Sequence, residues 1–180
     1  MKKLTYIFVF LLFFLLESAA QNPYKQQSVP GSVMSSSYDA FAPSFRNDSV
    51  MFFMSAKPNS TWQEITTEGG NNMTNIYSVN FEIDSISGKF EFIGLPKDEN
   101  SLNTKYFDGP IAFDRTGKIA CFVRMWMAQP GIPKSNGNTK LMFADYEDGD
   151  WVNIREFEHN SPDYSLNTPC FSEDGNTLYF

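Results

Sequence analysis

The sequence predicts an all-β fold built from tandem units of four short strands, and three observations lead to this prediction. After residue 20 the chain is rich in Phe, Tyr, Val, Ile and Thr and is broken repeatedly by Gly, Asn, Asp and Pro. Short apolar runs between such turn residues are typical of β-strands, and no segment after residue 20 keeps a helical period. A motif of an aromatic residue, a polar turn and an apolar strand also recurs along the chain.

Residues 1–20 have the pattern of a secretory signal peptide. Two lysines follow Met1, an 11-residue apolar run extends from Tyr6 to Leu16, and the small residues Ser18-Ala19-Ala20 precede Gln21. A membrane-spanning helix needs roughly 20 apolar residues, so this run is too short to serve as one. We therefore expect an exported protein that begins at Gln21 and keeps no membrane span after cleavage.

The charge of the mature chain disfavours two classes of partner. Removing Lys2, Lys3 and Glu17 from the 14 basic and 21 acidic residues leaves 12 and 20, a net charge of −8. An acidic chain repels the phosphate backbone of nucleic acid and an anionic lipid surface. We expect neither as a partner.

Internal repetition is the strongest organisational signal after residue 20. The motif occurs at Phe45–Phe53, Phe113–Phe122 and Phe171–Phe180, with spacings of 68 and 58 residues between the first aromatic residues. Asp174-Gly175 in the third copy supplies the side-chain acceptor and the positive-φ residue that a tight hairpin prefers. A proline precedes each copy: Pro43, Pro110 and Pro169.

Each of the first two units holds a second hairpin. The predicted strands 75–83 and 89–93 form the hairpin of the first unit, and strands 140–146 and 151–157 form that of the second. Each unit is therefore a meander of four strands, which is the blade of a β-propeller. A single blade leaves its faces uncovered, so neighbouring blades must stack.

The predicted organisation is a leader over residues 21–37 followed by a partial β-propeller over residues 38–180. Its parts are blade one at about 38–95, blade two at about 106–158, and the start of blade three at about 167–180. The sequence ends at Leu178-Tyr179-Phe180, and an unpaired apolar edge strand invites aggregation. We therefore expect a fragment of a longer protein, about two and a half blades of an incomplete propeller.

The third copy, Pro169-Cys170-Phe171-Ser172-Glu173-Asp174-Gly175 followed by Leu178-Tyr179-Phe180, resembles the TolB-type, WD-like β-propeller repeat. Residues 38–45 and 102–113 are similar to blade starts in Bacteroidetes envelope proteins that join such a propeller to an OmpA-like domain. In this sequence Glu173 stands where the repeat usually has proline. The resemblance implies a periplasmic or outer-membrane location, with peptidoglycan bound only through a C-terminal domain missing from these residues.

The resemblance implies a non-catalytic scaffold module that binds an envelope protein partner, and we do not expect an enzyme. An alternative is a propeller accessory domain of a secreted hydrolase or peptidase whose catalytic domain lies beyond residue 180. A truncated product without a function of its own is a third hypothesis. The single histidine, His159, leaves no histidine cluster, and no Gly-x-Ser-x-Gly nucleophile motif is present. We expect no cofactor.

Acidic residues and cysteines offer the candidate metal and redox sites, and each has a simpler interpretation. We expect no metal, because the acidic group belongs to a hairpin turn that needs polar residues. We expect Glu156, Glu158 and Asp163 to be solvated strand acids rather than glycosidase carboxylates. Cys121 and Cys170 leave two alternatives, a disulfide or, as we expect, two buried thiols. The acidic group is Asp145, Glu147, Asp148 and Asp150.

Aromatic residues near long loops provide the candidate contact surface. Trp151 begins a predicted strand and is expected to pack between blades, as large aromatic residues do in β-sheet cores. Trp126, by contrast, opens an apolar cluster that runs into a Pro/Gly loop. Long loops on rigid scaffolds often carry function. We therefore predict a contact surface at Trp126, Met127 and Ile132.

Overall fold

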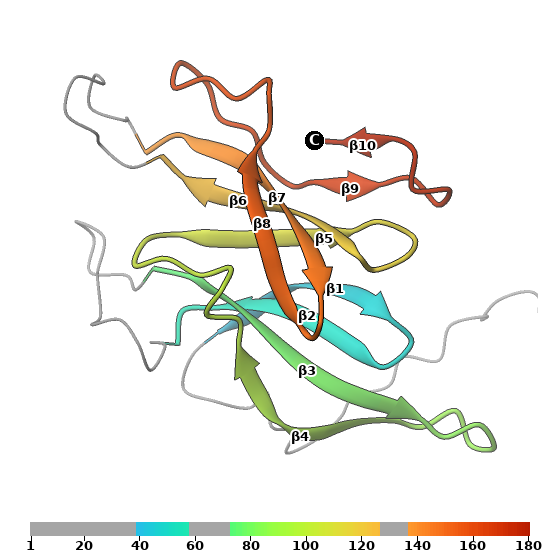
Figure 1. Cartoon of the computed structure of the whole chain (residues 1–180). Coiled ribbons are helices and arrows are strands. Elements are labelled where there is room, and N and C mark those ends of the chain that lie inside the picture. The colour runs from blue at the N-terminus through green and yellow to red at the C-terminus, as the bar shows by residue number, and fades with distance from the viewer. Residues whose placement is uncertain (1–38, 58–72, 127–136) are drawn as a thin grey trace, which may run out of the picture. The chain divides into compact units, whose positions relative to one another are not determined.

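A computed structural model describes residues 39–57, 73–126 and 137–180. These residues form two four-stranded antiparallel sheets and a two-stranded hairpin, with no helix among them (Figure 1). The predicted all-β class is therefore confirmed. The predicted signal peptide and the leader at 21–37 lie outside the described residues.

Each sheet is a meander of consecutive strands. The first sheet contains β1 (Ala40–Asn47), β2 (Val50–Ser55), β3 (Asn75–Ile83) and β4 (Phe90–Asp98). The second sheet contains β5 (Asp108–Phe113), β6 (Ile119–Met125), β7 (Thr139–Glu147) and β8 (Asp150–Glu156). The hairpin pairs β9 (Cys170–Phe171) with β10 (Leu178–Tyr179).

The two sheets pack face to face through one apolar core. Phe52 and Ile76 of the first sheet meet Phe122 and Met142 of the second, and Trp151 joins the same cluster. The ring centroids of Phe52 and Trp151 lie 6.0 Å apart, in an edge-to-face arrangement that aromatic pairs favour. Trp151 is 2 % exposed, as expected for a packing residue.

Strand β6 is buried on both of its faces. Ala120 and Phe122 point toward the first sheet, whereas Cys121 and Val123 point the other way, into a cluster that includes Phe171 of the hairpin. A strand with two buried faces reads as a continuous apolar run rather than an alternating one. This explains why apolar residues follow one another without interruption from Ile119 to Val123.

The first turn of each unit packs on the corresponding turn of the unit before it. Gly117, in the turn between β5 and β6, lies so close to Arg46 that an added methyl group would stand 2.6 Å from the Arg46 carbonyl oxygen. Gly175, in the turn between β9 and β10, lies against Arg115 in the same manner: a methyl group added there would stand 3.3 Å from the Arg115 main-chain nitrogen. The same turn-to-turn contact thus recurs, 58 residues further along the chain.

A threonine joins each sheet to the start of the chain segment that forms the next unit. The Thr74 carbonyl accepts the Asp108 N–H at 3.0 Å, and the Thr74 hydroxyl donates to the Asp108 carbonyl. Thr139 makes the same two bonds with Leu166, each at 3.0 Å. Both partners stand five residues before the first aromatic residue of a repeat, Phe113 or Phe171. We call this pair of bonds the threonine staple.

An asparagine after the fourth strand completes the edge of the third strand in both sheets. The Asn103 side chain accepts the Ile76 N–H at 2.7 Å and donates to the Ile76 carbonyl at 2.8 Å. Asn160 binds Leu141 in the same way, at 2.9 and 2.8 Å. Buried main-chain groups must find partners, and a side-chain amide supplies both a donor and an acceptor. We call this contact the asparagine clamp.

We predict that Gly117→Ala destabilises the protein much more than Gly88→Ala. Both glycines have φ of +66°, but nothing lies within 4 Å of a methyl group added at Gly88. Left-handed strain costs about 1 kcal/mol at either position, and the collision with Arg46 adds about 2 kcal/mol at Gly117. Urea unfolding of the two variants measures the difference. Equal losses would show that the contact between turns contributes nothing.

Removing the asparagine clamp should destabilise the second sheet. Asn160→Ala leaves the buried Leu141 N–H without its partner, whereas the Leu141 carbonyl keeps its bond from the Phe157 N–H. We expect a loss of about 2 kcal/mol in the free energy of unfolding. Asn176→Ala is the matched control, because Asn176 is exposed and its side chain binds only within its own turn. We expect that variant to stay within about 0.5 kcal/mol of the wild type. An equal effect of the two substitutions would contradict a structural role for the clamp.

Candidate contact site

Of the three predicted contact residues, Trp126 is the one among the described residues, while Met127 and Ile132 lie outside them. Trp126 directly follows β6, and its N–H donates to the Asn138 carbonyl at 2.9 Å, which extends the pairing of β6 with β7. The Lys140 ammonium lies 4.5 Å from the centroid of the Trp126 ring. Such a cation–π contact stabilises by about 0.5–1 kcal/mol at a partly exposed site. The indole is therefore held in place by β7.

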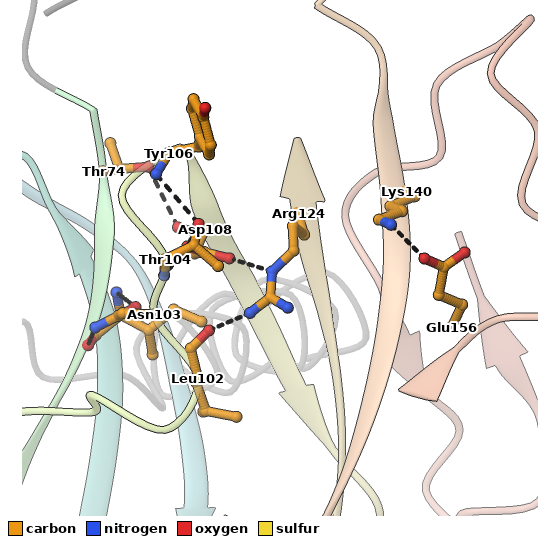
Figure 2. A network of polar contacts seen from close by, with 10 residues as sticks. Thr74, Leu102, Asn103, Thr104, Tyr106, Asp108, Arg124, Lys140 and Glu156 are labelled. Carbon is orange, nitrogen blue, oxygen red and sulfur yellow. Dashed lines mark hydrogen bonds and ion pairs between the residues drawn. The ribbon is translucent and has the colours of Figure 1, made fainter. Parts of the chain in front are cut away.

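Trp126 adjoins a row of four charged side chains that crosses the second sheet, one from each strand. Asp108 pairs in register with Arg124, and Arg124 pairs with Lys140. Glu156 pairs with Met142, which lies two residues beyond Lys140 on the same face of β7. Figure 2 shows the two ion pairs of this row, Asp108 with Arg124 and Lys140 with Glu156.

Asp108 is the fully buried member of the row. Its carboxylate accepts a bond from the Arg124 Nε at 2.7 Å and two more from the main-chain N–H and hydroxyl of Thr104 (Figure 2). Arg124 also donates to the Leu102 carbonyl. One carboxylate and one guanidinium thus hold the segment between the two sheets against β5 and β6.

Burial raises the pKa of Asp108 above its ordinary value, although the Arg124 charge and the Thr104 donors act in the opposite direction. Desolvation disfavours the charged form of a carboxyl group, and here it outweighs the compensating contacts. Arg124 is the charged group that acts on this carboxyl. In an exposed ion pair water would screen both charges, whereas here burial decides the direction in which the pKa of Asp108 shifts.

Asp108 has no acidic counterpart at the equivalent position of the next unit. Leu166 occupies the position of Asp108 in the next threonine staple and forms the same main-chain bonds. A buried ion pair usually contributes little net stability over apolar residues of similar size. At this junction Asp108 and Arg124 fix the path of the chain between the sheets through their bonds to Thr104 and Leu102.

The Lys140 side chain is 11 % exposed and that of Glu156 is 52 % exposed. The lysine stem is thus covered by its neighbours while Glu156 reaches solvent, so the outer end of the row is accessible. Together with the partly exposed Trp126 ring, this end presents an aromatic surface beside a neutralised ion pair. Such a surface suits recognition better than proton transfer, since each charge already has a partner.

Glu156, which the sequence singled out as a strand acid, is the outer member of this row, paired with Lys140. The histidine and the hairpin-turn acids lie apart from it. The His159 side chain is 69 % exposed and its nearest acid is Glu158. Asp145 binds Arg155 and Asn153, and these hydrogen bonds lower its pKa. Within the described residues, no group of three or more His, Cys, Asp or Glu side chains is arranged to hold a metal ion.

The two cysteines are free. Cys121 is buried in the second sheet, and this burial raises the pKa of its thiol to about 12. Cys170 is exposed, so the expectation of two buried thiols is wrong for this residue. Position explains the difference: Cys121 lies on the central strand β6, whereas Cys170 lies on the short hairpin strand β9, on the face turned away from the second sheet.

Asp108, Arg124 and Lys140 were missed by the sequence analysis. The signal for Asp108 was present, because an acid stands there at the repeat position that Leu166 fills with an apolar side chain. Arg124 is the charged residue of the otherwise apolar strand β6 (Ile119–Met125), and a charge in such a strand usually has a partner. Lys140 carried no such signal, since a lysine at the start of a strand is ordinary.

Comparisons with known proteins identify no relative of this chain. No protein-family model, curated protein or solved structure matches the chain. In the part of the chain that the structure describes, no helix has the length and apolar character needed to cross a membrane.

A double-mutant cycle tests the role of the buried pair. We expect Arg124→Met alone to cost about 3–5 kcal/mol in unfolding free energy, because it leaves Asp108 buried without its counter-charge. Asp108→Leu alone should cost a similar amount. The double variant should return to within about 1 kcal/mol of the wild type, since Leu166 already fills the equivalent position. Additive losses in urea unfolding would mean that the two residues act independently.

Because the pKa of Asp108 is raised, the free energy of unfolding should change with pH in a defined direction. The folded state holds this proton more tightly than the unfolded state, so the contribution of Asp108 to stability grows as the pH falls through its folded pKa toward the ordinary aspartate value. The difference in unfolding free energy between the wild type and Asp108→Asn should therefore shift in favour of the wild type between pH 7 and pH 4. A shift in favour of Asp108→Asn would mean that Arg124 outweighs burial.

Proposed function

We propose that this chain is a non-catalytic protein-binding scaffold of the bacterial cell envelope, built from β-propeller repeats. The observation that carries the proposal is the recurrence of inter-unit contacts. The threonine staple and the turn-to-turn contact each join the first unit to the second and the second to the third. Units that bind their neighbours identically form an array, and blades around a propeller are such an array.

The arrangement of the first strands also supports a propeller. β1 contacts β5, and β5 contacts β9, so the first strand of each unit lies beside the first strand of the next (Figure 1). The faces of the sheets then stack in sequence order, with the second sheet between its two neighbours. The TolB-type resemblance of residues 169–180 supports the same interpretation at the level of the sequence.

A binding role accounts for the polar side chains better than a catalytic one. Asp108, Arg124, Lys140 and Glu156 are paired with one another, so their charges serve to position the chain. The solvent-accessible part of this region is Glu156 together with the partly exposed Trp126, both of which contact Lys140. We place the contact with the partner at this end of the second sheet. Export into the periplasm, supported by the pattern of residues 1–20, would bring the site to an envelope protein.

Photo-crosslinking in cells that naturally produce the protein tests this proposal. A photoreactive phenylalanine analogue at position 126 should give a discrete crosslinked product with an envelope protein. The control is the same analogue at Ile86, which is 96 % exposed in the β3–β4 turn, at the opposite end of the strands. Fractionation of the product reports its compartment.

The proposal fails if position 126 gives no product, or gives the same products as position 86. Because a substitution at Trp126 removes its contact with Lys140, a urea unfolding curve should accompany the experiment. A folded variant without a crosslink would count against the site, whereas a cytoplasmic crosslinked partner would count against the envelope assignment.

A further inference from the structure

We draw no further inference here: the strongest candidate, the apolar face of the first sheet formed by Met51, Phe53, Tyr77, Val79 and Phe81, carries nothing, because nothing among residues 39–57, 73–126 and 137–180 shows what covers it.

Discussion

The described structure depends on the burial of β6 on both of its faces. Phe122 packs toward the first sheet and Val123 toward the hairpin, and both side chains are fully buried. Complete burial of side chains of this size stabilises by about 1.5–3 kcal/mol each. A sheet that is covered on one face only would forfeit half of this contribution. The second sheet is therefore stable because it has neighbours, which is the physical basis of a repeat architecture.

Apolar burial alone does not fix how one sheet lies on the next, since the hydrophobic effect has no direction. Directional contacts at both ends of the first strands remove this freedom. At one end the threonine staple joins Thr74 to Asp108, and at the other Gly117 lies against Arg46. A slip of one sheet along the other would break the staple and drive the two turns together. These contacts set the register that the apolar core leaves open.

Much of this fold could be predicted from the sequence because it follows from local patterns. The strand predicted over residues 75–83 matches β3, and the hairpin turns fall where Gly, Asn and Asp gather. The staple and the clamp could not be predicted, because Thr74 and Asn103 act on residues 34 and 27 positions away. Nothing local distinguishes these two residues from ordinary loop residues. Only when two units are compared in space does their equivalence with Thr139 and Asn160 become visible.

The candidate site was also only partly predictable, because its contacts join residues on different strands. Trp126 drew attention as an aromatic residue next to a loop, but its support comes from Lys140, which reaches it across the sheet. Asp108 could have been found by aligning the repeats, since an acid at an apolar repeat position needs a partner. Its partner Arg124 pairs with it across β5 and β6, but a register shift between Asp108 and Ile111 separates this pair from the regular pairing near the turn, so the pairing cannot be read from the turn alone.

The edges of the two sheets explain why the units pack face to face instead of joining edge to edge into one wider sheet. Each outer strand carries a positive-φ residue, and its pairing with the inner strand shifts register. These residues are Ala42 in β1, Gly94 in β4, Gly109 in β5 and Asn153 in β8. Irregular edges resist the addition of a further strand, because they present no regular row of main-chain donors and acceptors. With regular pairing along the edges disfavoured, the faces remain as the main route by which one unit can bind another, and the staples and turn contacts hold the sheets at the ends of the first strands.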